Sequence, residues 1–217
     1  MFALRRAFAE GKDIRELPRI LASDPLYPNA SVLVPFMANH DVKRFMNEPG
    51  ATIEGLKMAQ TFLMTVRGTP QLYYGDEIAL PGGDDPDNRR DFPGGFPGDA
   101  IDAFTNRNVQ QNSAFQNQKL LSHLRTQIEP LRHGALVELF AKEHQYAFAR
   151  TSRSDFAIVA FNNDSRPAHF SFGISSLPRS SAVALIDRLG NAKDLQVKGN
   201  VVEFDLPAQA SAIIVRR

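Results

Sequence analysis

The apolar stretch over residues 31–37 leads into three consecutive polar side chains, Asn39, His40 and Asp41. An imidazole beside a carboxylate can hydrogen-bond a polar ligand, and a carboxylate stabilises positive charge that develops nearby. We expect a buried strand at 31–37 to deliver these groups to an edge where a ligand can bind. The alternative is a polar turn in which the Asx side chains hydrogen-bond the backbone.

A second cluster of charged residues lies in the Gly-, Pro- and Asp-rich segment over residues 80–102. It is too irregular for a helix or a strand, and loops of this length in compact domains are usually functional or disordered. Asp85 and Arg89 stand four positions apart in it. The alternative for these two is a solvated turn in which they pair with each other, a contribution of about 0–1 kcal/mol.

The aspartates at 84, 85 and 87 also bring oxygen ligands together, as a calcium loop does. An EF-hand loop requires glycine at its sixth position and glutamate at its twelfth. Counted from Asp85, those positions hold Arg90 and Phe96. The sequence therefore predicts no metal site, and no pattern in it indicates a cofactor.

The elements that must position these residues follow from the spacing of apolar side chains. Strands at 31–37 and 70–74 flank a helix over 52–66, for which Thr52 is a plausible N-cap. This is a strand–helix–strand unit, and parallel strands present their ligands at their carboxyl ends. Further helices are expected over 2–22, with breaks at Gly11 and Pro18, and over 112–131.

The pattern changes at Gly134 to short apolar runs with a period of two, separated by turn residues. We therefore expect an antiparallel β-sandwich of seven or eight strands. The predicted architecture is α/β plus all-β, divided into regions 1–133 and 134–217. The expected strands cover residues 135–141, 146–150, 156–161, 168–172, 182–186, 201–206 and 212–215.

Composition excludes several classes of partner. The 217 residues carry 25 Lys and Arg against 24 Asp and Glu, a formal charge of +1. This balance shows no footprint for nucleic acid or an anionic membrane. The first ten residues are amphipathic and contain Glu10, which is not typical of a signal peptide or a membrane span. The absence of cysteine fits both the cytoplasm and a periplasm, so the compartment stays open.

Two motifs resemble those of a known family. The segment Phe36–Asp41 resembles the fourth signature region of the alpha-amylase superfamily, and Gly68–Glu77 resembles its eighth barrel strand. The segment Pro81–Phe92 is similar to the loop that follows that strand in the cyclomaltodextrinase and neopullulanase branch. Asn88 stands where that branch usually has cysteine. The resemblance implies that the first region is the last part of a (β/α)8 TIM barrel, from helix six to helix eight, and the second the family's C-terminal β-domain.

The resemblance also implies roles for the residues named above. Asp41 would be the transition-state stabiliser, and it would raise the pKa of a neighbouring general acid through like-charge repulsion. His40 would hydrogen-bond the same sugar, and Asn39, Asp85 and Arg89 would bind substrate. Hydrogen bonds to ring hydroxyls that strengthen in the transition state supply several kcal/mol in glycoside hydrolysis. The implied ligand is an alpha-glucan or a cyclodextrin.

A retaining glycosidase also needs a nucleophile and a general acid. The family's Arg-x-Asp signature matches Arg153-Ser154-Asp155, which lies between two predicted β-strands, and Arg89-Arg90-Asp91, which lies in the irregular loop; neither match follows a predicted buried strand. We therefore expect both groups to be absent, and the chain to be a C-terminal fragment of a retaining alpha-glucan hydrolase that is inactive alone. Two alternatives are a non-catalytic carbohydrate-binding or interaction module and one half of a split enzyme. The open edges of the predicted barrel strands favour pairing with a missing N-terminal barrel segment or with a second copy.

Overall fold

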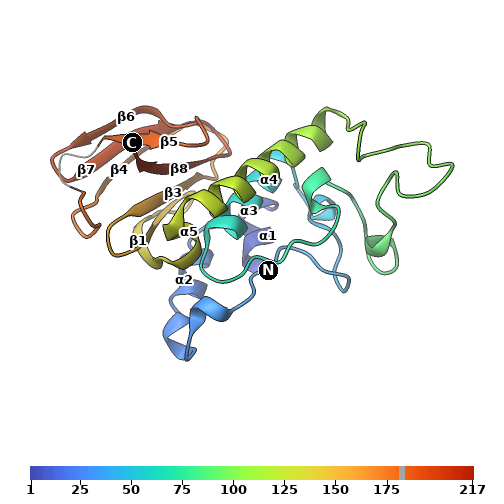
Figure 1. Cartoon of the computed structure of the whole chain (residues 1–217), viewed down its shortest axis with the longest axis horizontal. Helices are drawn as coiled ribbons and strands as arrows, with labels where there is room; N and C mark the ends of the chain where they lie inside the picture. Colours follow the sequence, from blue (N-terminus) through green and yellow to red (C-terminus); the bar gives the residue numbers. More distant parts are fainter. Residues whose placement is uncertain (181–183) are drawn as a thin grey trace.

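A computed structural model describes residues 1–180 and 184–217 of the chain. Figure 1 shows helices and loops on one side of the molecule and two sheets on the other, with helix α4 running along the sheets toward a long green loop. No helix among the described residues has the length and apolar character needed to cross a membrane. The helices are α1 (Phe2–Phe8), α2 (Glu16–Leu21), α3 (Ile53–Thr65), α4 (Val109–Gln127) and α5 (Glu129–His133).

The three predicted helical regions are confirmed, with different interruptions. The 52–66 prediction corresponds to α3, and the Thr52 side chain caps it by accepting a hydrogen bond from Gly55 N at 3.0 Å. Gly11 adopts a positive φ of 65° after α1, whereas Pro18 lies inside α2. The 112–131 prediction is two helices, because the extended backbone of Ile128 ends α4 and begins α5.

The predicted strand at 31–37 is wrong in its first half, and the one at 70–74 is reduced to a single bridge. Residues Ala30–Val32 form a 3₁₀ turn, and the Asn29 side chain caps it by accepting a hydrogen bond from Ser31 N at 3.0 Å. Further on, Phe36 and Gln71 form one isolated parallel bridge. A parallel pair is stable inside a wider sheet. In the described part of the chain no further strand lies beside these two segments, and their pairing is limited to this bridge and the hydrogen bonds from Thr69 N to Leu33 O and from Gln71 N to Pro35 O.

Among the described residues after Gly134, eight strands form, and each pairs antiparallel with its neighbours. The five-stranded sheet has the order β1-β2-β3-β8-β5 and the three-stranded sheet the order β4-β7-β6. Residues 182 and 183 of the strand predicted at 182–186 lie outside the described residues. Sequence reasoning missed β6, a largely polar strand at a sheet edge. The strands are β1 (Ala135–Ala141), β2 (Gln145–Thr151), β3 (Phe156–Asn162), β4 (Ala168–Gly173), β5 (Leu185–Asp187), β6 (Lys193–Lys198), β7 (Val201–Leu206) and β8 (Ala210–Arg216).

The five-stranded sheet is buried on both faces. One face packs against the smaller sheet, in a cluster that includes Ile158 and Phe204. The other face packs against the helices, where Phe148 and Phe161 meet Phe62 of α3 with ring centroids about 6 Å apart. This burial explains why all seven residues of β3 are inaccessible to solvent.

Helices α1 and α3 approach each other closely at Gly55. A Cβ atom at this position would lie 2.2 Å from the carbonyl oxygen of Phe8, a distance that no side chain tolerates. The close approach puts Phe8 against both Phe62 and Phe161. The helices and the five-stranded sheet therefore share one apolar core.

Two arginines connect the end of α3 to the start of the sheets. Arg150 of β2 is buried, and it donates to Gly134 O at 2.7 Å and to Thr65 O at 2.7 Å. Arg125 of α4 donates to Met64 O at 2.8 Å and to Gly68 O at 2.6 Å. Helix ends leave carbonyls without intrahelical donors, and these guanidinium groups satisfy them.

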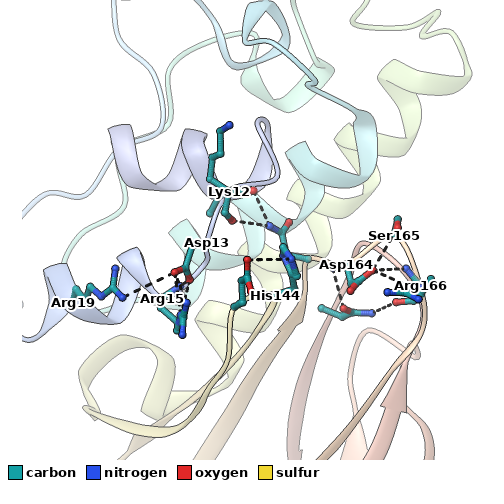
Figure 2. Close-up of polar contacts among 12 residues, drawn as sticks. Lys12, Asp13, Arg15, Arg19, His144, Asp164, Ser165 and Arg166 are labelled. Carbon is teal, nitrogen blue, oxygen red and sulfur yellow. Dashed lines mark hydrogen bonds and ion pairs between the residues drawn. The ribbon is translucent and has the colours of Figure 1, made fainter.

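A polar junction at the C-terminal end of α1 also joins the helical region to the β region. The amide of Ile14 donates to Glu143 O at 2.9 Å, and the Asn163 side chain donates to Ala7 O at 2.8 Å. Figure 2 shows this junction, with Asp13 between Arg15 and Arg19 on the side of the first helices. Regions 1–133 and 134–217 are thus joined by apolar and by polar contacts.

Candidate functional site

Arg5 of α1 holds the loop that carries Asn39, His40 and Asp41. Its Nε donates to Met37 O at 3.0 Å, and its Nη2 donates to Lys43 O at 2.6 Å. Its third contact is a buried ion pair with Glu48 at 2.5 Å. The backbone is therefore fixed on both sides of the three polar residues.

The Asn39 side chain is used inside this loop. Its Oδ1 accepts a hydrogen bond from Asp41 N at 2.9 Å, which closes an Asx turn. His40 and Asp41 point outward with more than half of each side chain exposed, and their nearest nitrogen and oxygen atoms are 3.2 Å apart. Asn39 thus shapes the turn that presents the other two.

The predicted second loop lies against the first. The Asn88 amide donates to His40 O at 2.9 Å and to Val42 O at 3.0 Å, and Arg89 Nε donates to His40 O at 3.0 Å. Four of the five residues singled out from the sequence are brought together here: His40, Asp41, Asp85 and Arg89. The family resemblance had implied that both loops line one substrate cleft.

Arg89 lies between two carboxylates. Its Nε is 2.8 Å from Asp85 Oδ1, and its Nη2 is 3.8 Å from Asp41 Oδ1. All three side chains are about half exposed or more. Solvent screening keeps such pairs weak, so the arrangement contributes little to stability and leaves hydrogen-bonding groups of both kinds available to a ligand. The Asp–Arg pairing considered as the alternative forms, and it does so beside Asp41.

Arg44, which the sequence reasoning did not single out, lies beneath both loops. It is fully buried, its Nη1 donates to Tyr74 O at 2.6 Å, and its backbone amide donates to Gly82 O at 2.8 Å. Its guanidinium carbon is 4.6 Å from the ring centroid of Tyr73 and 4.7 Å from that of Tyr74. Cations over aromatic faces are stabilised by the ring quadrupole. In the sequence, the available signal for Arg44 was its position three residues after Asp41.

Asp76 is a second buried charge that was missed. It follows Gly75, whose φ of 89° requires a residue without a side chain. Burial is the main cause that raises the pKa of Asp76 from 3.8 to about 7, and neighbouring Arg44 opposes the shift. Within the described residues Oδ2 of Asp76 has no hydrogen-bond partner. Buried carboxylates with raised pKa values are common at functional sites.

Aromatic residues border the two loops. Tyr74 is partly exposed and its hydroxyl donates to Arg90 O at 2.9 Å, while Phe96 in the long loop is largely exposed. Phe92 packs instead against Phe104, with ring centroids 4.6 Å apart. Tyr74 and Phe96 thus offer apolar faces of the kind that stack on sugar rings.

The arrangement can bind a ligand rich in hydroxyl groups. His40 and Arg89 supply donors, Asp41 and Asp85 supply acceptors, and Asp41 can stabilise positive charge on a bound molecule. Within residues 1–180 and 184–217, no group of three or more His, Asp or Glu side chains is placed to hold a metal ion. The four side chains themselves offer hydrogen bonding and electrostatic stabilisation.

Comparison with known proteins finds relatives of one family. The model of the alpha-amylase catalytic domain matches residues 12–134. A cyclomaltodextrin glucanotransferase of Bacillus sp. (strain 17-1) is 31% identical over 183 residues, which is 83% of this chain and 24% of that protein. A cyclomaltodextrinase of Thermoanaerobacter pseudethanolicus is 30% identical over 135 residues, 62% of this chain and 22% of that protein. The chain spans a quarter or less of the length of such relatives.

Solved structures show the same fold. The alpha-amylase from Geobacillus thermoleovorans, complexed with acarbose, superposes with a TM-score of 0.81 at 25% identity, covering 99% of this chain and 46% of that one. The debranching enzyme from Nostoc punctiforme superposes with a TM-score of 0.79 at 27% identity, covering 95% of this chain and 40% of that one. Because the family model matches more than half of its residues, this chain belongs to the alpha-amylase family.

Proposed function

We propose that this chain is the C-terminal part of a retaining alpha-glucan glycoside hydrolase and that it supplies one wall of the substrate cleft. The observation that carries the proposal is the convergence of His40, Asp41 and Arg89 where two loops of a parallel pair meet. In the proposed role, Asp41 stabilises the positive charge of the oxocarbenium-like transition state, and His40 donates to a hydroxyl of the same sugar. Asp85 and Arg89 bind the neighbouring part of the substrate.

The proposal includes the absence of a nucleophile and a general acid from this chain. Asp155, the aspartate of the Arg153-Ser154-Asp155 match, lies in the turn between β2 and β3 and accepts a hydrogen bond from Phe156 N. The two carboxylates at the candidate site, Asp41 and Asp85, both face Arg89.

We also propose how the two regions correspond to the family architecture. Residues 1–133 would form the part of the barrel from helix six to helix eight, and residues 134–217 the β-sandwich of the C-terminal domain. The parallel bridge between Phe36 and Gln71, with α3 connecting its two segments, supports the first assignment. The apolar cluster between the two antiparallel sheets supports the second.

A split enzyme is a second candidate, and the exposed side chains of the parallel pair favour it. Val34 is 52% exposed and Leu72 is 44% exposed, although both are apolar residues of strand-like segments. An apolar groove of about 280 Å³ runs beside Val34, between α1, α2 and α3. Exposed apolar strand edges pair with other chains. The partner would be a chain that supplies the neighbouring barrel strands, or a second copy.

Calorimetric titration of the chain with maltoheptaose and with β-cyclodextrin tests the proposal. Asp41→Asn and Arg89→Ala are expected to weaken binding, because each removes a hydrogen-bonding group from the proposed cleft wall. Asp194→Asn is the matched control, since Asp194 is an exposed aspartate of β6. Binding that all three variants leave unchanged would contradict the assignment and favour a binding module that uses another surface.

A reducing-sugar assay on starch and pullulan tests the second half of the proposal. The isolated chain is expected to release no product, because positioning groups alone do not replace covalent and acid catalysis. Turnover that disappears in Asp41→Asn would show that this chain carries its own catalytic carboxylates.

A further inference from the structure

Three side chains buried beneath the loops of the candidate site leave polar atoms unbonded. Arg44 and Asn88 are inaccessible to solvent, and Asp76 is 4% exposed. Among the described residues, Nε and Nη2 of Arg44, Oδ2 of Asp76 and Oδ1 of Asn88 have no hydrogen-bond partner. A buried polar atom without a partner costs about 1–3 kcal/mol. Because the arginine atoms are donors and the other two are acceptors, a rearrangement within the cluster can form new hydrogen bonds.

The Arg44 side chain is confined between two backbone segments. Its Nη1 donates to Tyr74 O at 2.6 Å, and the rings of Tyr73 and Tyr74 pack against its guanidinium. A Cβ atom at Gly75 would lie 3.0 Å from Nη1, and one at Gly82 would lie 3.1 Å from Cδ of Arg44. A displacement of the guanidinium therefore requires both glycine segments to move.

The segment at Gly82 is connected in turn to the residues of the candidate site. A Cβ atom at Gly82 would lie 2.9 Å from Cα of Asn88, whose side chain donates to His40 O at 2.9 Å. The next residue, Arg89, donates to the same carbonyl and faces Asp41. Movement of Arg44 is thus transmitted to the place where the two loops meet.

Asp76 is the group that can move Arg44. The charged groups around its carboxyl are Arg44, Glu77 of the same turn and Arg5 of α1. Helix α3 contributes the neutral Gln60, whose Nε2 donates to Asp76 O at 3.2 Å, and on α4 the side chain of Lys119 lines a pocket with Glu77. Burial is the main cause that raises the pKa of Asp76 to about 7, so its charge changes near neutral pH.

The two charge states of Asp76 act differently on Arg44. A neutral carboxyl leaves the guanidinium on Tyr74 O, as the structure has it. An ionised carboxylate attracts a guanidinium more strongly than a backbone carbonyl does, and burial strengthens the attraction. We propose that Arg44 is a positioning residue of the saccharide site and that deprotonation of Asp76 draws its guanidinium from Tyr74 O, which separates the two loops and weakens binding. The identity of the ligand rests on the proposed function, whereas the movement of Arg44 does not.

NMR of the full chain without ligand tests the movement. Between pH 5.5 and 8.5, the Nε–H signal of Arg44 and the amide signals of Gly82 and Asn88 are expected to shift with the midpoint of the Asp76 carboxyl carbon. In Asp76→Asn, which keeps the shape of the side chain, these signals should stay constant. An Arg44 signal that is unchanged while Asp76 titrates, or an Asp76 that is fully ionised at pH 5.5, would overturn the proposal.

Calorimetric titration with maltoheptaose at pH 6 and pH 8.5 tests the effect on binding. The affinity of the wild type is expected to fall about fivefold at the higher pH, at the lower end of usual coupling between two sites. Asp76→Asn retains the titratable His40, so the difference between the two profiles belongs to Asp76. Asp194→Asn, an exposed change in β6, is the matched control and should behave like the wild type.

The outcomes separate this inference from the proposed function. Equal pH dependence in the wild type and Asp76→Asn would overturn the coupling and leave the saccharide site in place. Absence of binding at both pH values would contradict the proposed function and with it the effect on binding, and the NMR titration would still decide whether Asp76 moves Arg44.

Discussion

The β2–β3 pair and the parallel pair at 33–36 and 69–71 each contain an apolar run, 156–161 in the first and 33–36 in the second, with opposite results. The first pair keeps an unbroken register from Gln145–Asn162 to Thr151–Phe156, and packed layers cover both of its faces. The second forms one bridge and leaves Val34 half exposed. Apolar side chains create the tendency to form a strand, but neighbours that pair and cover it decide whether the strand forms.

Truncation of Phe148 is expected to give the largest effect on stability, because the β2–β3 pair depends on a fully packed core. Phe148→Ala should lower the free energy of unfolding by about 3–5 kcal/mol, since the cavity opens where Phe62, Phe161 and Tyr146 meet. Leu72→Ala, in the incomplete pair, should cost well under half as much. Urea unfolding followed by circular dichroism measures both. Equal losses would show that the two regions are equally packed.

The raised pKa of Asp76 should make stability depend on pH in the loop region. The folded protein holds a proton on Asp76 between about pH 4 and pH 7, where the unfolded chain has lost it. Stability therefore falls as the pH rises through this window, by at most about 1.4 kcal/mol per pH unit, and levels off above it. The pKa of Asp13 is lowered to about 2, so Asp13 has the opposite effect: its contribution to stability is lost as the pH falls below about 4.

Asp76→Asn is the variant that isolates this contribution, because the amide has the same shape and does not ionise. Urea unfolding at pH 4.5, 6 and 7.5 should show a flatter profile for the variant than for the wild type. Asp194→Asn, an exposed change in β6, should leave the profile unaltered. A wild-type stability that rises between pH 4.5 and 7.5 would contradict the buried-acid interpretation.

Asn88→Ala should have a smaller effect that is confined to the candidate site. It removes one donor from His40 O and one from Val42 O, while Arg89 still donates to His40 O. We expect a loss of about 1–2 kcal/mol in the local opening free energy. Hydrogen exchange of residues 39–43 measures it, with exposed Asn112→Ala in α4 as the control. Unchanged exchange would mean that Arg5 and Arg44 alone hold the loop.

Of these variants, Val34→Lys should change the free energy of unfolding least, by no more than about 0.5 kcal/mol. It should have the largest effect on self-association. A lysine on a strand edge opposes pairing with another chain. Light scattering should show concentration-dependent association of the wild type and little in the variant. Val109→Lys, a change at an 87% exposed site in α4, is the matched control and should associate like the wild type. A wild type that stays monomeric at high concentration would remove the case for a partner at this edge.

The sequence patterns predicted the β region and the helices well, for identifiable reasons. Runs such as Phe156–Phe161 are apolar at every position, which is typical of a strand buried on both faces. The edge strand Lys193–Lys198 was not predicted, because edge strands are polar and a short polar strand has the same sequence pattern as a loop. The strand predicted from residue 31 failed because Asn29 caps a turn there.

For the candidate site, the family resemblance implied that His40, Asp41, Asp85 and Arg89 line one cleft, and the structure places them side by side. The residues that hold the site were not predictable in the same way. Arg44 and Asn88 act mainly through backbone carbonyls, as with Tyr74 O and Val42 O. Every residue offers such a carbonyl, so the partner of a buried donor leaves no trace in the sequence.

The contacts of Arg125 and Arg150 with the end of α3 limit how related chains can diverge in evolution. Arg150 belongs to the β region, but the carbonyl of Thr65 that it binds belongs to the helical region. A recombination event that exchanged the β region at Gly134 would have to bring an arginine at this position or leave a helix end without its donor. Gly134 therefore marks a change of secondary structure that gene exchange cannot cross freely, and the two regions are expected to evolve together.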